Sequence, residues 1–122
     1  MILRPVALAG AESGGHTGRV VLASFPTEPM RCVAGALPRD EAHWGFEIKW
    51  DGMRVLAFID ADGGVRLQSA NGHDVTASFP ELAGLGAAVD GRRAVLDGEV
   101  VALDDAGHPS FARLQQRIHV RG

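Results

Sequence analysis

The chain has 122 residues, of which 46% are hydrophobic and 22% are charged, as in an ordinary folded protein and unlike a disordered one. Twelve basic and fifteen acidic side chains give a net charge of −3. This balance excludes binding to nucleic acid through overall positive charge, so any such contact needs a local basic patch or another domain.

The length, the apolar runs and the cysteine content exclude further classes. A chain of this size is one domain or part of one. No apolar run approaches the roughly 18 to 20 residues that span a bilayer, so we expect no membrane association. The single cysteine, Cys32, cannot form an internal disulfide and lacks the paired spacing of a zinc site, which fits a reducing, cytoplasmic location.

The N-terminal part of the chain has no periodic pattern. Residues 1–24 are predicted to be a flexible segment, because "GAESGGHTGR" is rich in small and polar side chains. The same stretch could instead be translated sequence upstream of the true start. Residues 25–44, which contain three prolines, are predicted to form an irregular segment laid across the domain.

Alternating hydrophobicity then predicts a series of strands, at residues 44–50, 53–60 and 65–71. An Asp-Gly turn joins the first two strands, and a glycine-rich hairpin turn joins the last two. One face of the third strand is expected to carry Val65, Leu67 and Ser69. The two tryptophans, Trp44 and Trp50, are expected to be core or wall aromatics.

A helix is predicted over residues 78–90. Ser78 has the character of an N-cap, Pro80 falls in the first turn and Glu81 occupies the capping-box position. This segment follows the strands directly, so we expect it to pack against their sheet.

A last strand, interrupted by Gly98, is predicted over residues 93–105, and a turn then leads to a short helix capped by Ser110. The predicted fold class is therefore α+β, with an antiparallel sheet, at least four strands and two helices. The final helix ends with nothing to close the fold, so residues 25–122 are interpreted as a partial domain, incomplete at the C-terminus.

Two of the predicted strands carry charged side chains at alternate positions, which point to the same face of an extended chain. The first strand and the turn after it would align Glu47, Lys49 and Asp51, and the last strand would align Asp97 and Glu99. If the two strands are close together, these groups surround a concavity and need pairing or a ligand. The plain alternative is a solvated face, where alternating Glu and Lys is a common solubilising pattern.

Lys49 could act as a nucleophile only after losing its proton. A lysine in water has a pKa near 10.4, so about one molecule in 2,500 is neutral at pH 7. The neighbouring carboxylates of Glu47 and Asp51 favour the charged form further. A catalytic role therefore needs desolvation, a bound metal ion, or Arg54 folded back beside the lysine across the glycine turn.

The stretch "KWDGMR" at residues 49–54 resembles the Lys-x-Asp-Gly-x-Arg motif of the covalent nucleotidyltransferases, which include ATP-dependent DNA ligases, RNA ligases and mRNA capping enzymes. "LQSANGHDVTASFPEL" and "VLDGEVVALDDAGHPSFARLQQR" follow in the order and spacing of bacterial ATP-dependent DNA ligases. The resemblance covers residues 25–120. It implies an antiparallel-sheet nucleotidyltransferase fold, here the N-terminal part of a ligase adenylation domain.

The resemblance also implies a reaction and a set of site residues. Lys49 would attack the α-phosphorus of ATP, release pyrophosphate and hold AMP as a phosphoramidate, and the AMP would pass to the 5′-phosphate of nicked duplex DNA. Mg²⁺ or another divalent cation on the triphosphate would offset charge and orient the phosphate. The implied nucleotide-binding residues are Glu47 at the adenine edge, Ile48, Arg54 at the ribose, and Glu99 at the ribose hydroxyls. The implied supporting residues are Asp51, Gly52, Asp97, Ser69 and Asn71.

The sequence departs from the family pattern at two points. Where the family usually has Ser-Arg-Asn-Gly, this chain has Ser-Ala-Asn-Gly, so Ala70 lacks a cation expected near the phosphates unless Arg66 or His73 replaces it. The aromatic residue that stacks on adenine, the metal-binding glutamate, the C-terminal lysine pair and the OB-fold of the family lie beyond Gly122. We therefore expect that the isolated chain does not seal nicks and self-adenylates very slowly or not at all.

Two other functions remain open at this point. The chain could be a non-catalytic remnant that binds nucleotide or a partner protein. It could also belong to an RNA ligase or capping-type transferase that uses the same lysine. The "FEIKWDG" context and the "FARLQQR" tail favour a DNA ligase by resemblance.

Overall fold

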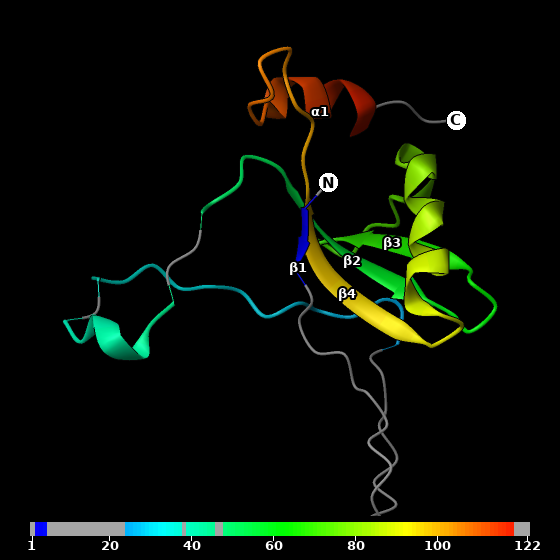
Figure 1. Cartoon of the computed structure of the whole chain (residues 1–122), viewed down its shortest axis with the longest axis horizontal. Helices are drawn as coiled ribbons and strands as arrows, with labels where there is room; N and C mark the ends of the chain where they lie inside the picture. The colour runs from blue at the N-terminus through cyan, green and yellow to red at the C-terminus, as the bar shows by residue number, and fades with distance from the viewer. Residues whose placement is uncertain (1, 5–23, 38, 46–47, 119–122) are drawn as a thin grey trace, which may run out of the picture.

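The computed structural model describes residues 2–4, 24–37, 39–45 and 48–118, and its centre is a four-stranded antiparallel sheet (Figure 1). The strands are β1 (Ile2–Arg4), β2 (Met53–Ile59), β3 (Val65–Ser69) and β4 (Ala94–Val100), in the spatial order β1-β4-β2-β3. The helical elements are the 3₁₀ helices η1 (Glu41–His43), η2 (Thr76–Ser78) and η3 (Pro80–Val89), and the α-helix α1 (Phe111–Ile118). This arrangement confirms the predicted α+β class with an antiparallel sheet.

Two predictions about strands are wrong. Residues 44–45 and 48–50 of the expected first strand have no regular structure, and residues 46 and 47 lie outside the described part. The fourth strand comes instead from β1, within the expected flexible segment, and it pairs with β4 through Leu3 opposite Gly98. A strand needs a free edge to pair with, and β2 is already bonded to β3 on one side and β4 on the other.

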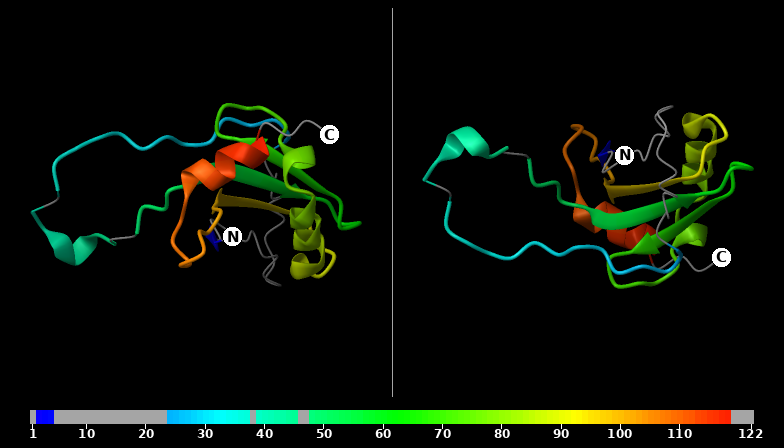
Figure 2. Two further views of the ribbon diagram at one scale, coloured as in Figure 1. Left: turned by 90° about the horizontal axis from the view of Figure 1, so that it is seen from above. Right: turned by 90° about the horizontal axis from the view of Figure 1, so that it is seen from below.

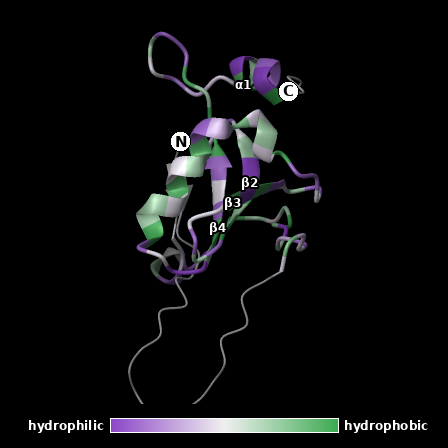
Figure 3. Cartoon of the chain, turned by 90° about the vertical axis from the view of Figure 1, so that its right-hand side faces the viewer, coloured by the Kyte–Doolittle hydropathy of each residue, from purple (hydrophilic) through white to green (hydrophobic). Residues whose placement is uncertain are grey.

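One face of the sheet carries the hydrophobic core. Alternate residues of the three longer strands point into it, and η3 and α1 cover it, as Figure 2 shows. Its buried members are Val55, Ala57, Leu67, Phe79, Leu82, Val100 and Leu114. In Figure 3, η3 is mainly white and green whereas α1 is mainly purple, so η3 supplies the more apolar cover. Val65 packs against this cluster beside Leu67, as the alternation predicts.

The predicted helix over residues 78–90 forms with different ends. Ser78 closes η2, and the residue that precedes η3 is Phe79, whose side chain cannot cap it. Pro80 does fall in the first turn. Glu81 makes no capping-box contact, because Arg117 of α1 holds its carboxylate through two hydrogen bonds of 2.6 and 3.0 Å.

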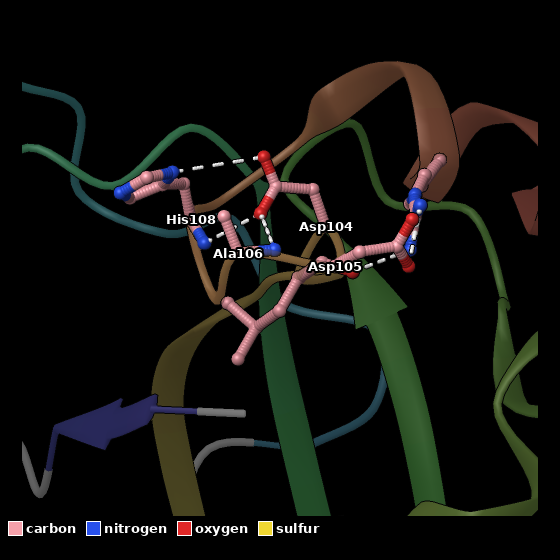
Figure 4. Close-up of polar contacts among 6 residues, drawn as sticks. Asp104, Asp105, Ala106 and His108 are labelled. Carbon is pink, nitrogen blue, oxygen red and sulfur yellow. Dashed lines mark hydrogen bonds and ion pairs between the residues drawn. The ribbon is translucent and has the colours of Figure 1, made fainter.

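The turn between β4 and α1 is built around Asp104 (Figure 4). One oxygen of its carboxylate accepts hydrogen bonds from the backbone N–H groups of Ala106 at 2.9 Å and His108 at 2.8 Å. β4 ends at Val100, before the predicted residue 105. An isolated bridge then joins Leu103 to Pro109. The backbone carbonyl of Ser110 then accepts the first helical bond, from Leu114.

The opposite face of the sheet is crossed by residues 25–31, which we name the strap. Gln68 of β3 is fully buried beneath it, and its amide exchanges two hydrogen bonds with the backbone of Thr27, of 2.8 and 2.5 Å. Phe25 packs edge-to-face on Phe58 of β2, with ring centroids 5.3 Å apart. These contacts agree with the predicted irregular segment for residues 25–31 only, because the later described residues of the predicted range 25–44 extend away from the sheet in both Figure 1 and Figure 2.

The tryptophans do not share one environment. Trp44 is 62% exposed, so its predicted place in the core is wrong. Trp50 is half-buried. Within the described ranges, every helix is too short or too polar to cross a lipid bilayer.

Candidate functional site

The candidate site lies on the strap side of the sheet. There β2 brings Arg54, the last residue of the "KWDGMR" segment, next to the charged residues of β4. Their antiparallel register sets Arg54 opposite Glu99 and Leu56 opposite Asp97. Arg54 donates from Nε to Asp97 Oδ1 at 2.9 Å and from Nη2 to Asp97 Oδ2 at 2.5 Å. This bidentate bond raises the pKa of Arg54 above its usual value and fixes the plane of the guanidinium.

Arg54 also connects the sheet to the strap. Its Nη1 donates to the backbone carbonyl of Met30 at 2.6 Å. The three contacts leave this side chain about one-third exposed. Arg54 is therefore held in one orientation by groups from β4 and from the strap, as a preorganised ligand-binding residue would be.

Glu99 lies next to this pair on the same face of the sheet. Burial raises the pKa of its carboxyl, and the negative charges of Asp97 and Asp51 raise it further, while the positive charges of Lys49 and Arg54 oppose the shift. Two cations and two other carboxylates thus act on Glu99 here, and β4 places Asp97 and Glu99 on one face, as the alternation in the sequence predicts. The third carboxylate, Asp51, accepts a 3.4 Å hydrogen bond from the backbone N–H of Phe111.

Lys49 reaches this cluster from an irregular segment and not from a strand. The residue is exposed, and it is close enough for its charge to act on Glu99. Ile48, an expected nucleotide-binding residue, is 73% exposed. Glu47, expected at the adenine edge, lies outside the described residues. The described geometry therefore joins Lys49, Arg54, Asp97 and Glu99.

Gly52 links Lys49 to β2 at a point of very close approach. A Cβ atom there would meet the backbone oxygen of Val100, and it would lie 2.7 Å from Val101 Cγ1 and 2.9 Å from Glu99 Cγ. Atoms cannot approach so closely without a shift of the backbone. Only glycine lets the chain bend at Asp51–Gly52 while passing directly over β4.

The turn after β3 contains Ser69, Ala70 and Asn71. Ser69 Oγ accepts a 3.2 Å hydrogen bond from the backbone N–H of His73, so this side chain stabilises the turn. The backbone N–H of Ala70 donates to the carbonyl of Arg54 at 3.2 Å, which ties the turn to the site. Asn71 is exposed and lines a cavity of about 330 Å³ between the turn and the strap.

Of the residues predicted to replace a cation at position 70, Arg66 contacts another group, because its guanidinium lies over the ring of Phe25, 4.6 Å from its centroid. His73 donates its backbone N–H to Ser69 and lines a pocket together with Ala70 and Asn71. Arg31 of the strap also reaches this turn, because its Nη2 donates to the carbonyl of Ala70 at 3.3 Å. Sequence reasoning missed Arg31, Gln68 and the carbonyl of Met30, since no periodic pattern predicts which strap atoms meet the sheet.

No cluster of three or more His, Cys, Asp or Glu side chains suited to a metal ion occurs among residues 24–37, 39–45 and 48–118. Both oxygens of Asp97 accept from Arg54, and the charges of Lys49 and Arg54 act on Glu99. A divalent cation would therefore fit this site mainly through oxygen ligands that it brings with it, such as phosphates.

Comparison with known proteins gives a consistent result. The family model described as "ATP dependent DNA ligase domain" matches residues 27–121. The chain is 46% identical over 91 residues to the multifunctional non-homologous end joining DNA repair protein LigD of Mycobacterium tuberculosis, covering 73% of this chain and 12% of that protein. It is 48% identical over 100 residues to DNA ligase C1 of Mycolicibacterium smegmatis, covering 77% of this chain and 28% of that protein.

Two solved structures are similar in fold and sequence. The ligase domain of LigD from M. tuberculosis matches with a TM-score of 0.53 and 46% identity, over 62% of this chain and 24% of that one. A mycobacterial DNA ligase D complexed with ATP and MES matches with a TM-score of 0.54 and 48% identity, over 58% of this chain and 23% of that one. The chain thus spans about 12% of the length of the LigD proteins it matches and about a quarter of the solved ligase domain.

Proposed function

Because the chain belongs to the ATP-dependent DNA ligase domain family, we propose that it is part of an enzyme that uses ATP to seal nicks in DNA during repair and recombination. One observation carries this proposal. The "KWDGMR" and "LDGEV" segments, more than forty residues apart in sequence, meet through the bidentate bond between Arg54 and Asp97. The charges of Lys49 and Glu99 lie beside that bond.

In the proposed reaction, Lys49 is the group that accepts AMP. Its neutral Nζ forms a bond to the α-phosphorus of ATP while the bond from that phosphorus to the bridging oxygen breaks. Pyrophosphate leaves with the electron pair, and the nitrogen gives up one proton to yield lysyl-AMP. The AMP then passes to the 5′-phosphate of a nick, and attack by the adjacent 3′-hydroxyl on that phosphate seals the strand and releases AMP.

The other residues bind and orient the nucleotide. Arg54 and Glu99 are proposed to contact the ribose, with Glu47 at the adenine edge and Ile48 beside it. Asp97 orients Arg54, and Gly52 sets the bend that brings Lys49 over β4. Asp51 accepts from the start of α1, Ser69 stabilises the turn after β3, and Asn71 is proposed to support the same turn. Mg²⁺ enters with the substrate as MgATP, where it offsets the phosphate charge and supports in-line attack.

A chimera tests this proposal in a complete ligase. Residues 27–118 of this chain replace the matching stretch of the M. tuberculosis LigD ligase domain, with which they share the fold. We expect the chimera to form a covalent band with α-labelled ATP and Mg²⁺ on a denaturing gel, and to seal nicked duplex DNA. Lys49→Ala should abolish both signals, since no other group accepts the AMP.

Two outcomes would contradict the proposal. A folded chimera that binds ATP without Lys49-dependent labelling would support a non-catalytic, nucleotide-binding remnant. Labelling followed by sealing of nicked RNA but not nicked DNA would support the RNA ligase alternative. The isolated chain, tested in parallel, is expected to seal no nicks and to label very slowly or not at all, because it spans only about a quarter of the solved ligase domain.

A further inference from the structure

We propose that Arg31, on the strap, is an additional phosphate-binding residue of this site. The inference rests on the proposed function, because it takes the ligand to be a nucleotide or a 5′-phosphorylated strand. The chemistry recognised is the same in both cases, a phosphate group with charged oxygens.

The first argument is the position of the Arg31 guanidinium. Its Nη2 donates to the carbonyl of Ala70 at 3.3 Å, and the N–H of Ala70 donates to the carbonyl of Arg54 at 3.2 Å. The preceding strap residue, Met30, accepts from the side chain of Arg54 at 2.6 Å. These three bonds form a closed circuit that holds Arg31 against the turn after β3 and connects it, through Ala70 and Met30, to Arg54.

The second argument is the charge balance of the site. Among the described residues, five arginines have a carboxylate partner within 4.0 Å, and these are Arg54, Arg92, Arg93, Arg113 and Arg117. Arg66 lies against the ring of Phe25. Arg31 and Arg39 have no carboxylate partner among the described residues, and of these two only Arg31 is tied to the site, through its bond to the neutral carbonyl of Ala70. Within the part of the chain that the structure describes, the other four N–H donors of its guanidinium have no partner.

The third argument is the space beside Arg31. A cavity of about 330 Å³ lies between the strap and the turn after β3, and both Arg31 and Asn71 line it. Ala70, whose side chain is a single methyl group, also lines it. Glu28 also lines this cavity, and its carboxylate opposes an anion there. The proposal thus predicts that phosphate affinity falls when Arg31 is replaced. It also predicts that phosphate affinity rises when the charge of Glu28 is removed.

The experiment compares phosphate-bearing ligands with a matched ligand that lacks phosphate. Calorimetry on the full 122-residue chain measures the Kd of ATP, adenosine and tripolyphosphate for the unmodified chain and for Arg31→Gln. We expect Arg31→Gln to weaken ATP and tripolyphosphate about fivefold to tenfold and to leave adenosine unchanged, because a charge-assisted bond to phosphate is lost. Glu28→Gln should strengthen the same two ligands, and Arg39→Gln, at another exposed arginine, should change neither.

A second arm separates the two sources of phosphate. Oligonucleotides with a 5′-phosphate or a 5′-hydroxyl are titrated into the same variants. Weakening by Arg31→Gln of the 5′-phosphorylated strand alone would assign Arg31 to DNA, and weakening of ATP alone would assign it to the nucleotide. Equal affinities of unmodified chain and Arg31→Gln for every phosphate ligand would overturn the proposal. So would an equal loss for adenosine, since that result indicates a purely structural role for the bond to Ala70.

Failure of this inference is distinguishable from failure of the proposed function. The Lys49→Ala comparison in the chimera reports on AMP transfer and does not involve Arg31. Lys49-dependent labelling together with Arg31-independent phosphate binding would remove the inference alone. Tripolyphosphate binding that depends on Arg31, without any Lys49-dependent labelling, would remove the proposed function alone.

Discussion

The two halves of the candidate site differ in how firmly the rest of the chain holds them. The sheet half consists of Arg54, Asp97 and Glu99, fixed by strand register, by a bidentate bond and by the carbonyl of Met30. The lysine segment, which we define as residues 32–37, 39–45 and 48–50, extends away from the sheet in both Figure 1 and Figure 2. Four of its large apolar side chains are exposed, at 91% for Val33, 81% for Leu37, 62% for Trp44 and 73% for Ile48, while Trp50, next to the sheet half in sequence, is half-buried.

This contrast indicates that the residues proposed to orient the ligand and the lysine proposed as nucleophile lie in different parts of the chain. The first part contributes to the stability of the fold, and the second contributes little. A substitution in the sheet half removes bonds that hold strands and strap together, so it should lower both ligand binding and the free energy of unfolding. A substitution in the lysine segment removes few contacts within the described residues, so it should affect chemistry without affecting stability.

Gly52 is the junction between the halves, and its substitution should have the largest effect among substitutions within the site. Gly52→Ala forces a Cβ into the backbone of β4 and the side chain of Val101, which we expect to cost about 3 kcal/mol in the free energy of unfolding. Urea denaturation measures the loss. Gly45→Ala is the matched control, because a Cβ at Gly45 would meet no atom within 4 Å. Equal urea midpoints for Gly52→Ala and Gly45→Ala would contradict the close approach of Gly52 to β4.

Asp97→Asn tests the sheet half directly. The substitution keeps the shape of the side chain but removes the charge that holds Arg54, so we expect a loss of about 1.5 to 3 kcal/mol in the free energy of unfolding. Asp105→Asn is a control of the same type, since its ion pair with Arg113 is 2.9 Å long but its carboxylate is 93% exposed. That control should cost no more than about 1 kcal/mol. If the two losses are equal, the sheet half is no more firmly held than the surface.

The same contrast explains how far the sequence alone could predict the molecule. Alternating patterns in β2, β3 and β4 predicted which side chains share a face, because pleating follows from the extended backbone. The alternation in residues 44–50 was just as regular, yet the described residues of that range, 44–45 and 48–50, form no strand. Alternation specifies the two faces of a strand, but pairing depends on which edges are still free once the other strands have bonded.

For the site, too, the sequence predicted the positions within strands but not the contacts with irregular segments. The alternation aligned Asp97 with Glu99, and β4 keeps them on one face opposite Arg54. The contacts of Arg54 with Met30 and of Arg31 with Ala70 were beyond such reasoning, because they join a strand or turn to an irregular segment more than twenty residues away. Contacts of this kind depend on the path of a loop across a finished sheet, which local sequence does not encode.

The pKa of Glu99 reports on the electrostatic interaction between the two halves, because charges from both of them act on its carboxyl group. Burial raises this pKa, so the folded state binds its proton more tightly than the unfolded chain. The ionised carboxyl therefore destabilises the fold at neutral pH, and the penalty disappears as the pH falls below the unfolded value of about 4.5. Glu99→Gln should accordingly be more stable than the unmodified chain at pH 7, with the difference shrinking on acidification.

The Lys49 charge should be visible in the same titration. Lys49→Ala removes a cation that favours the ionised carboxyl, so the pKa of Glu99, followed by carbon-detected NMR of its carboxyl group, should rise further. Arg39→Ala, elsewhere on the lysine segment, is the control and should leave the titration unchanged. If the titration curve of Glu99 is identical with and without Lys49, the two halves do not interact electrostatically. Lys49 would then not belong to the cluster.

The smallest effect is expected in the lysine segment itself. Trp44→Ala and Ile48→Ala delete large apolar side chains that are 62% and 73% exposed, so each should change the free energy of unfolding by no more than about 0.5 kcal/mol. Phe58→Ala, which deletes a buried aromatic ring of β2 under the strap, should cost about 3 to 5 kcal/mol in the same urea titration. A large loss for either exposed residue would mean that the lysine segment packs on the chain in solution, and the two halves would then be one cooperative unit. Near-zero losses would instead mean that the position of Lys49 is set mainly by the bend at Gly52 and by the charges around Glu99.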